Sequence, residues 1–517
     1  MDTTFSPGRL RHLLALAGAL IVACLAPFAA RADDDLPGRV GRVAEVVGEA
    51  RTINPEGAWV TLVRNQPLST GDRITTDKSA RATLQVGSTT LRVGAASDVV
   101  VTQLDDRKFR IRFDHGQLAL RVRSDDILGE LFIETDEGAW VPHHPGQYRF
   151  DRVARGVLGA QAVVGDMLLE APDSSLPVAA NQRAEVWRAG AQQATHYRMT
   201  APAKDAFGDW ALAQDKADDK LAAASAAAGV PIEMTGAADL ARHGVWSTGA
   251  DGARVWTPAK LPAGWQPFQQ GAWSWISPWG WTWVDDQPWG FAPFHYGRWF
   301  NQRGHWNWTP GQWGATRPIY APGLVGWFGG AGLAVAGAPA VGWVALAPDE
   351  AFHPAYAVSS AYWAAINNPS VAAPARRALP AAKARVRVVP TGAMRYANRG
   401  AADAIAVLAS AGLVSHAPVS TMPTLAKAER RKALADEALA RLAVQGPPGP
   451  PVGHSALSPT ASVVQVPVGL ATANTPARAP SPAGKSVGAA APPIANIARP
   501  SAGIVSPAPV LKPIAPV

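Results

Sequence analysis

The sequence predicts a mainly β protein, and three observations lead to this fold class. Between residues 38 and 200, short segments alternate polar and apolar side chains and are separated by turn residues. Between residues 246 and 363, tryptophan and glycine recur at a fixed spacing. One short Ala-rich stretch between these regions has a helical composition. We therefore expect an N-terminal β-sandwich or roll, a short helical linker, a Trp-rich β-hairpin repeat domain, and a disordered Pro/Ala-rich tail.

Residues 38–125 predict the sandwich or roll. Segments 81–86 and 108–113 alternate polar and apolar residues, which is the period of a strand with one buried face. Turn residues such as Gly71 separate such segments. Residues 126–200 continue the β-rich pattern as a further segment.

The first of these regions resembles a FecR-like domain. The likeness lies in Gly38-Arg39-Val40 at the first strand, in residues 68–74 around the first turn, and in Gly116 late in the region. That family is named for the periplasmic half of an iron-citrate signal transducer, whose cytoplasmic N-terminal segment handles a sigma factor. Because the export signal is expected to precede the domain directly, the resemblance implies a periplasmic β domain without sigma-factor regulation.

Residues 201–230 are predicted to form a helical linker. The stretch is rich in Ala, Asp and Lys and poor in β-branched residues, and Pro202 suits a helix start.

Residues 234–368 are predicted to be a repeat domain, because sixteen of the twenty tryptophans lie between Trp246 and Trp363. The period is about twenty-six residues, which leaves room for two strands and two turns in each unit. One hairpin cannot bury an aromatic face alone, so neighbouring units should stack or share a sheet. One series of tryptophans follows a glycine by two residues, and a second series lies about ten residues further on: Trp246, Trp273 and Trp299, then Trp256, Trp283 and Trp308.

An uncharged stretch, residues 322–348, is long enough to span a membrane. Pro339 and several glycines interrupt it, and it contains the weaker fourth repeat from Trp327 to Trp343. We therefore expect loops and buried strands there.

The combination of a FecR-like domain and Trp-rich repeats resembles a group of exported proteins of unknown function. The resemblance covers residues 205–368 and includes Gly244-Val245-Trp246 and Gly342-Trp343. It implies a location in the cell envelope and supplies no activity or catalytic residue.

The tryptophans have two interpretations. They form a hydrophobic core, or they form an exposed surface on which sugar rings stack; both hold if one indole of each unit is buried and another exposed. In a Trp-x-Trp pair both rings share one face of a strand. The candidate ligand-stacking residues are Trp275, Trp281, Trp306 and Tyr296.

No metal site and no cofactor is predicted. His143-His144, and His295 with His305, are the best metal candidates, but neither pair has a third ligand at a defined spacing.

No catalytic residue is predicted, so the protein is expected not to be an enzyme. Nucleotide-binding, nucleophile-elbow and zinc-protease motifs are absent from the sequence. The acidic pairs Asp285-Asp286 and Asp349-Glu350 leave a carboxylate-dependent glycan hydrolase as an alternative.

Residues 1–32 predict a cleavable secretion signal. Two arginines precede an apolar run, and Ala30-Arg31-Ala32 gives a cleavage site before Asp33. Cys24 is the single cysteine and lies in a sequence resembling a lipoprotein signal box, so lipidation there is the alternative. Cleavage before Asp33 would leave no cysteine for disulfides.

Residues 370–517 are predicted to be a basic, largely disordered tail. They carry sixteen Lys or Arg against four Asp or Glu, and residues 446–517 contain sixteen prolines.

We therefore expect a periplasmic or envelope-associated binding or scaffolding protein without a transmembrane span after signal cleavage. Its expected partner is an envelope glycan such as peptidoglycan; another envelope protein is the alternative. Nucleic acid is not expected, because the chain is predicted to be exported. The sequence does not indicate an oligomeric state.

Overall fold

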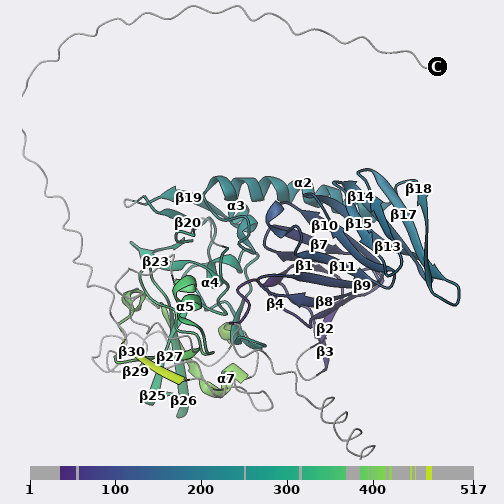
Figure 1. Cartoon of the computed structure of the whole chain (residues 1–517). Coiled ribbons are helices and arrows are strands. Elements are labelled where there is room, and N and C mark those ends of the chain that lie inside the picture. Colours follow the sequence, from purple (N-terminus) through teal and green to yellow (C-terminus); the bar gives the residue numbers. More distant parts are fainter. Residues whose placement is uncertain are drawn as a thin grey trace, which may run out of the picture. The chain divides into compact units, whose positions relative to one another are not determined.

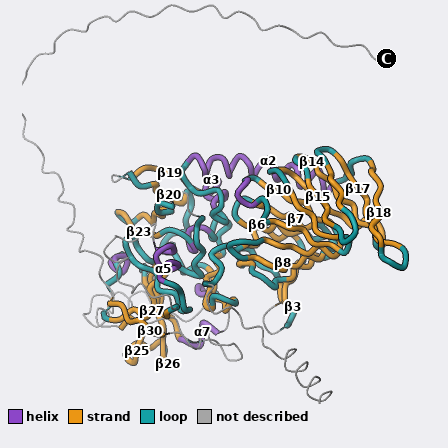
Figure 2. Tube along the Cα trace, in the orientation of Figure 1, coloured by secondary structure: helices purple, strands orange, loops and turns teal. Residues whose placement is uncertain are grey.

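The computed structural model describes residues 35–53, 57–249, 252–313, 317–367, 385–393, 395–401, 403–414, 418–421, 443–444, 449 and 462–467. The expected secretion signal, with Cys24, lies outside these residues, as does most of the expected tail. Strands dominate the described part of the chain, and the long helix α2 (Ala206–Ala227) is the main exception (Figure 2). No helix in this part is long and apolar enough to cross a membrane.

Two sheets of nine strands each, counted over the described residues, form the N-terminal region (Figure 1). In spatial order, sheet A contains β18 (Ala194–Thr200), β17 (Gln182–Ala189), β14 (Val157–Val164), β13 (Gly146–Ala154), β10 (Gln117–Val122), β7 (Thr89–Val93), β6 (Arg81–Val86), β1 (Gly41–Val47) and β4 (Pro67–Leu68). Sheet B contains β16 (Ser175–Val178), β15 (Met167–Glu170), β12 (Gly138–Pro142), β11 (Leu131–Thr135), β9 (Phe109–His115), β8 (Asp98–Leu104), β5 (Arg73–Thr76), β2 (Ala50–Ile53) and β3 (Trp59–Thr61).

The two sheets share one apolar core, as the alternating pattern predicts. On β7, Leu91 and Val93 are buried in the core, while Arg92 between them points to the outer face of sheet A. The boundary expected at residue 125 does not divide this core. β13 pairs with β10 and β11 pairs with β9, so the strands before and after residue 125 join into one continuous sheet in each layer. Residues 38–125 and 126–200 thus make a single sandwich.

The predicted helix is present as α2, and Asp205 rather than Pro202 caps it. The Asp205 side chain accepts a hydrogen bond of 2.9 Å from the backbone N–H of Gly208. The helix is more than a linker, because it packs on the outer face of sheet A against β10. The short elements η2 (Ala237–Asp239) and α3 (Leu240–His243) then lead into the Trp-rich region.

Each predicted Trp repeat is an antiparallel hairpin with two tryptophans directly opposite each other. Trp246 faces Trp256, Trp273 faces Trp283, Trp299 faces Trp308, and Trp327 faces Trp343. The hairpins are β19 (Gly244–Thr248) with β20 (Arg254–Pro258), β21 (Gly271–Ile276) with β22 (Gly280–Asp285), β23 (Arg298–Gln302) with β24 (His305–Thr309), and β25 (Val325–Val335) with β26 (Ala338–Ala345). The last of these confirms the strands expected within residues 322–348.

The hairpins surround one aromatic core rather than extending a single sheet. The first and third share a sheet through Trp256 opposite Trp308, whereas the second forms its own two-stranded sheet. Ring centroids within the core lie 4.6 Å apart for Trp273 and Trp327 and 5.0 Å apart for Trp256 and Trp289. Offset and edge-to-face aromatic pairs stabilise a core by roughly 0.5–1.5 kcal/mol each beyond the area they bury. The short helix α4 (Ala292–His295) lies between the second and third hairpins in the sequence and is buried in this core.

The repeated glycine has a steric reason. A Cβ atom at Gly244 would lie 2.3 Å from the indole of Trp256, and one at Gly297 would lie 2.8 Å from the indole of Trp308. In the first three hairpins, the second tryptophan therefore covers the glycine at the start of the hairpin. This contact explains the Gly-x-Trp spacing in the sequence.

Part of the expected disordered tail is folded, which corrects the prediction for residues 370–517. β28 (Ile405–Ala409) pairs with β26, and its Ile405, Val407 and Leu408 are buried in the aromatic core. Burial of these apolar residues stabilises the folded segment by more than the conformational entropy that is lost on ordering it. The Ala/Pro-rich composition had led us to expect the opposite balance. The remaining described elements are α5 (Ser360–Asn367), β27 (Val386–Thr391), η3 (Ala397–Gly400), α7 (Ser410–Val414), η4 (Val419–Thr421), β29 (Ala443–Val444) and β30 (Ser462–Pro467), with η1 (Asp125–Ile127) in the sandwich.

The glycine contact predicts a difference between two substitutions in the third hairpin. Gly297 and Gly304 both have positive φ, 63° and 85°, but a Cβ atom at Gly304 meets nothing within 4 Å. Gly304→Ala should therefore cost only the left-handed backbone penalty, about 1–2 kcal/mol. Gly297→Ala adds a clash with the carbonyl oxygen of Thr309 at 2.1 Å and should lower the thermal midpoint much further. Equal midpoints for the two variants would contradict the steric account.

Candidate functional site

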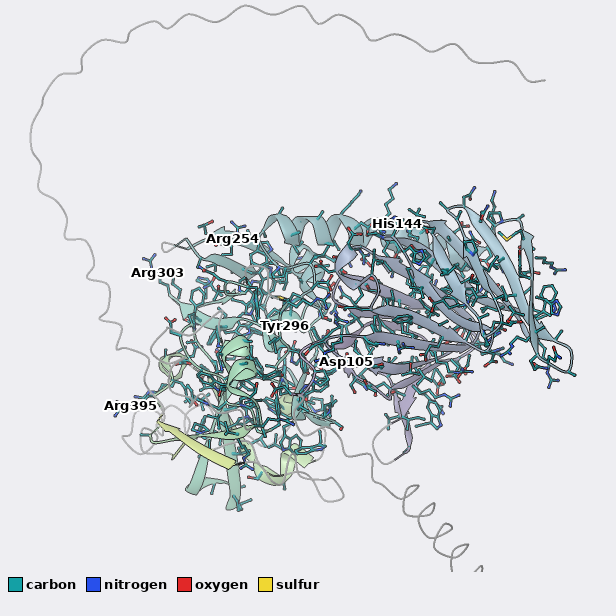
Figure 3. The ribbon with its side chains drawn as sticks, in the orientation of Figure 1. Asp105, His144, Arg254, Tyr296, Arg303 and Arg395 are labelled. Atoms are coloured by element: carbon teal, nitrogen blue, oxygen red, sulfur yellow. The ribbon has the colours of Figure 1, made fainter. Side chains whose placement is uncertain are left out.

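The four predicted stacking residues are buried, so they do not form an exposed sugar platform. Trp275, Trp281, Trp306 and Tyr296 are 9%, 5%, 4% and 2% exposed, respectively. Tyr296 lies in the interior of the Trp-rich region (Figure 3). Stacking on a sugar needs an uncovered ring face, and neighbouring side chains and backbone cover these rings. This burial supports the interpretation that the tryptophans form a hydrophobic core.

Some of the buried indole N–H groups are hydrogen-bonded within the fold, whereas others, such as those of Trp273 and Trp299, have no partner among the described residues. Trp306 donates to the side-chain oxygen of Gln266 at 2.8 Å, and Trp308 donates to the carbonyl of Tyr296 at 2.9 Å. Buried indoles normally find such acceptors, because an unpaired N–H is costly.

The histidine candidates do not converge on a metal site. His295 is fully buried, its Nδ1 lies 2.7 Å from the carbonyl of Ala321, and burial lowers its pKa to about 3. His143 and His144 both lie beside the single carboxylate of Asp166. Over the described ranges, no group of three or more His, Cys, Asp or Glu residues is placed to hold a metal ion.

The acidic pairs have structural partners. Asp285 ends β22 and accepts hydrogen bonds from the Trp283 indole at 3.0 Å and the Gln287 backbone at 2.9 Å. Its burial raises its pKa well above the ordinary value. Glu350 accepts hydrogen bonds from the backbone N–H groups of Ala347 and Ala397, at 2.7 and 2.6 Å.

A polar cavity lies between the outer face of sheet A and the α2–η2–α3 segment. Its volume is about 240 Å³, and its wall contains five arginines and three carboxylates. The arginines are Arg42, Arg64, Arg92, Arg123 and Arg242, and the carboxylates are those of Glu45, Asp218 and Asp239.

The floor of the cavity is made by arginines that the strands of sheet A point outward. Arg42 on β1 donates to Gln85 on β6 at 3.0 Å and is paired with Asp239 of η2. Arg92 on β7 donates to Asp215 and Asp218 of α2 at 2.9 and 2.8 Å. Each guanidinium is thus held in a fixed orientation by more than one partner.

The same arrangement continues along α2 beyond the cavity floor. Arg121 and Arg123 share Asp219, with N–O distances of 2.9 and 2.7 Å. Arg149 on β13 binds both oxygens of Asp205 at 2.7 and 2.6 Å. A row of arginine–aspartate pairs therefore fastens the helix across the sheet.

These pairs act on the pKa values of the helix carboxylates. The hydrogen bond from Arg149 holds the pKa of Asp205 below its ordinary value. Burial alone would raise the pKa of Asp219, but the hydrogen bonds and charges of Arg121 and Arg123 outweigh it and lower that pKa. Both carboxylates remain ionised partners of the arginines at neutral pH.

The rim of the cavity carries cations with fewer partners. In the part of the chain that the structure describes, no carboxylate lies within ion-pairing distance of Arg64, and Arg242 reaches Asp218 only at 3.9 Å. His243 lies beside them, and burial together with the charges of Arg242 and Arg64 lowers its pKa despite the opposing charge of Asp239.

Two buried donors in the wall have no partner among the described residues. They are Nη2 of Arg123 and the hydroxyl of Ser88. Both atoms are buried within the wall, so they are not open to a ligand in the cavity. The rim cations Arg64 and Arg242 can instead accept an oxyanion while the floor arginines stay paired with the helix.

A family of unknown function (DUF6600) matches residues 237–350. The matched segment contains all four Trp hairpins, together with η2 and α3 in the wall of the cavity. Sheet A and α2 lie outside it.

No curated protein is significantly similar to the chain. Two crystal structures of a Parabacteroides distasonis ATCC 8503 protein, named as an anti-sigma factor, share 10% identity with it, at TM-scores of 0.22 and 0.21. Each match covers 25% of this chain and 60% of that protein, so the chain spans about three fifths of the neighbour's length.

The sequence reasoning missed the cavity arginines, although a signal for them exists. Arg92 lies between two core residues on a strand, so its side chain must point to the outer face. The following helix places Asp215, Asp218 and Asp219 on adjacent turns. A sheet face that carries arginines and a later Ala-rich helix that carries aspartates but little apolar surface together indicate that the helix packs on the sheet through ion pairs.

The lowered pKa values predict how stability depends on pH. A carboxylate whose pKa is lowered by folding stabilises the protein above its unfolded pKa, about 3.9, and loses that contribution as the pH falls through the folded pKa. The thermal midpoint of Asp219→Asn should therefore lie below that of the wild type at pH 6, and the gap should shrink as the pH approaches 3. Asp209→Asn removes a carboxylate of the same helix that makes no ion pair with any described residue and serves as the control. A gap that stays constant over this pH range would contradict the pairing.

Proposed function

We propose that the protein is a non-enzymatic binding module of the bacterial cell envelope and that its cavity holds the carboxylate-bearing end of an envelope glycan such as peptidoglycan. The observation that carries this proposal is the cavity beneath α3, with five arginines in its wall and the under-paired cations Arg64 and Arg242 at its rim. The envelope location rests on the secretion signal expected at residues 1–32, and the N-terminal sandwich is proposed to be FecR-like.

Arginine chemistry supports an oxyanion as the ligand. A guanidinium presents planar N–H donors that match the two oxygens of a carboxylate or phosphate. A space of about 240 Å³ lies below the usual range for drug-sized ligands, so it fits one charged sugar or one terminal residue of a peptide stem rather than a long segment.

The same chemistry supports binding rather than catalysis. Arginine stays protonated in proteins, so it holds negative charge but does not exchange protons as an acid or base. Of the three carboxylates in the wall, Asp239 is paired with Arg42 and Asp218 is paired with Arg92. Glu45 is the third, and it has no such pairing with a described residue.

A second candidate function is assembly with another envelope protein, and the edge strand β18 favours it. This strand ends sheet A, and its Tyr197 and Met199 are exposed. An exposed edge with large apolar side chains can accept a strand from a partner. Such assembly would not depend on the arginine cavity.

Calorimetric titration tests the first function. The wild-type chain should bind a soluble disaccharide-peptide fragment of peptidoglycan with free carboxylates, and it should bind the fully amidated fragment at least tenfold more weakly. The variant Arg64→Gln/Arg242→Gln should lose at least about tenfold in affinity, because a hydrogen bond to a charged group contributes roughly 1.5–3 kcal/mol. Its fold should persist, since neither arginine belongs to the paired floor.

Arg303→Gln is the matched control, because Arg303 is an exposed arginine at a hairpin turn outside the cavity wall (Figure 3). It should bind like the wild type. Equal affinity for the free and amidated fragments, or equal losses for the cavity and control variants, would refute the proposal.

A further inference from the structure

A second cavity lies in the Trp-rich region, and three glutamines line it. Its volume is about 210 Å³. The loop that precedes β21 supplies Gln266, Gln269 and Gln270, and β28 and η4 supply Val407 and Val419 on the other side. This glutamine cavity shares no wall residue with the arginine cavity.

The charge of the two cavities differs. The wall of the arginine cavity contains five arginines and three carboxylates, whereas none of the described residues in the wall of the glutamine cavity is ionisable. Moving a charged ligand from water into a site without an opposite charge is costly. The glutamine cavity therefore suits a neutral ligand that forms hydrogen bonds.

Each of the three glutamines uses one end of its amide group within the fold. The Oε1 atom of Gln266 accepts a hydrogen bond of 2.8 Å from the indole of Trp306. The Nε2 group of Gln269 donates to the backbone carbonyl of Asp403 at 2.8 Å. The Oε1 atom of Gln270 accepts a hydrogen bond of 3.0 Å from a neighbouring glutamine side chain. These bonds hold the three amide groups in fixed orientations.

The other end of each amide group is open. The Nε2 groups of Gln266 and Gln270 and the Oε1 atom of Gln269 make no hydrogen bond to a described residue. Unlike the unpaired atoms of Arg123 and Ser88, these three atoms are not enclosed in the wall. The cavity therefore offers a ligand two donors and one acceptor, all on side chains that the fold already holds.

A sugar ring matches this set of groups. A hydroxyl group both donates and accepts, so the hydroxyls of one ring can meet the two donors and the acceptor together. An ionised carboxylate or phosphate only accepts, and it would repel the Gln269 oxygen. Trp265, Val407 and Val419 supply apolar surface for the C–H groups of the ring. The volume lies below the range for drug-sized ligands, so the cavity fits one ring.

We propose that the glutamine cavity binds one neutral pyranose sugar through the open amide ends of Gln266, Gln269 and Gln270. The assignment does not rest on the carboxylate site proposed above, because the two cavities have separate walls. Either assignment can fail without the other.

An NMR titration of the full chain with glucose, N-acetylglucosamine and glucuronic acid at pH 7 tests this site. At least one of the two neutral sugars should bind saturably. Glucuronic acid, which carries a carboxylate where glucose carries a hydroxymethyl group, should bind at least about tenfold more weakly than the tighter neutral sugar, because the wall has no opposite charge for it.

The variant Gln269→Ala/Gln270→Ala should weaken binding of the neutral sugar at least about tenfold, since it removes two hydrogen bonds to the ligand. Both side chains are only half-buried, so the fold should persist. Gln266 is left unchanged, because it also holds the indole of Trp306. Gln302→Ala, at an exposed glutamine outside the cavity, is the matched control and should bind like the wild type.

The wild-type protein provides a second measurement if the double variant folds poorly. The side-chain amide resonances of Gln266 and Gln270 should shift when the neutral sugar is added, while that of Gln302 should not. Binding of neither neutral sugar, equal affinity for glucuronic acid, equal effects of the cavity and control variants, or unmoved Gln266 and Gln270 resonances would overturn the proposal. Loss of neutral-sugar binding in Arg64→Gln/Arg242→Gln would move the sugar to the arginine cavity and overturn it as well.

Discussion

The row of arginine–aspartate pairs between sheet A and α2 is the interaction on which the rest of the architecture depends. The helix buries few apolar side chains, chiefly Phe207 and Ala211, so hydrophobic packing alone cannot hold it. The next buried residue of the helix is Asp215, whose carboxylate forms an ion pair with Arg92. A cation–π contact adds to this attachment: the guanidinium of Arg81 lies 4.6 Å from the ring centroid of Trp210.

Buried charge makes this contact specific. Removing one partner of a buried ion pair leaves an uncompensated charge and costs roughly 3–5 kcal/mol, whereas a solvent-exposed pair contributes at most about 1 kcal/mol. The helix can therefore adopt few other positions on the sheet. Fixing α2 also fixes η2 and α3, where Asp239 meets Arg42, and these elements close the polar cavity. The candidate binding site is thus a consequence of how the helix is attached.

The fold class and the hairpins could be predicted from the sequence because their signals are local. Alternation identifies a strand such as β6, and the Gly-x-Trp spacing records the contact of Gly244 with Trp256 within one hairpin. Burial of the tryptophans could not be predicted, because it depends on which hairpins pack together. Trp275 looks the same in the sequence whether its ring is exposed to a sugar or buried in the core, as it is in the structure. The cavity was missed for a similar reason: Arg42 and Asp239 are separated by 197 residues, and only the three-dimensional fold brings them together. The folding of β28 was missed because its apolar run lies within a Pro-rich and Ala-rich composition.

A double-mutant cycle on Arg92 and Asp215 tests the central claim most directly. The midpoints and free energies of unfolding would be measured for Arg92→Ala, Asp215→Ala and the double variant, with the exposed pair Arg51 and Glu49 as the reference cycle. If buried charge holds α2 in place, each single change should be strongly destabilising and the coupling between the two should reach about 2 kcal/mol. The reference pair should couple by no more than about 1 kcal/mol. Additive effects at Arg92 and Asp215, or couplings of the same size in both cycles, would contradict the account.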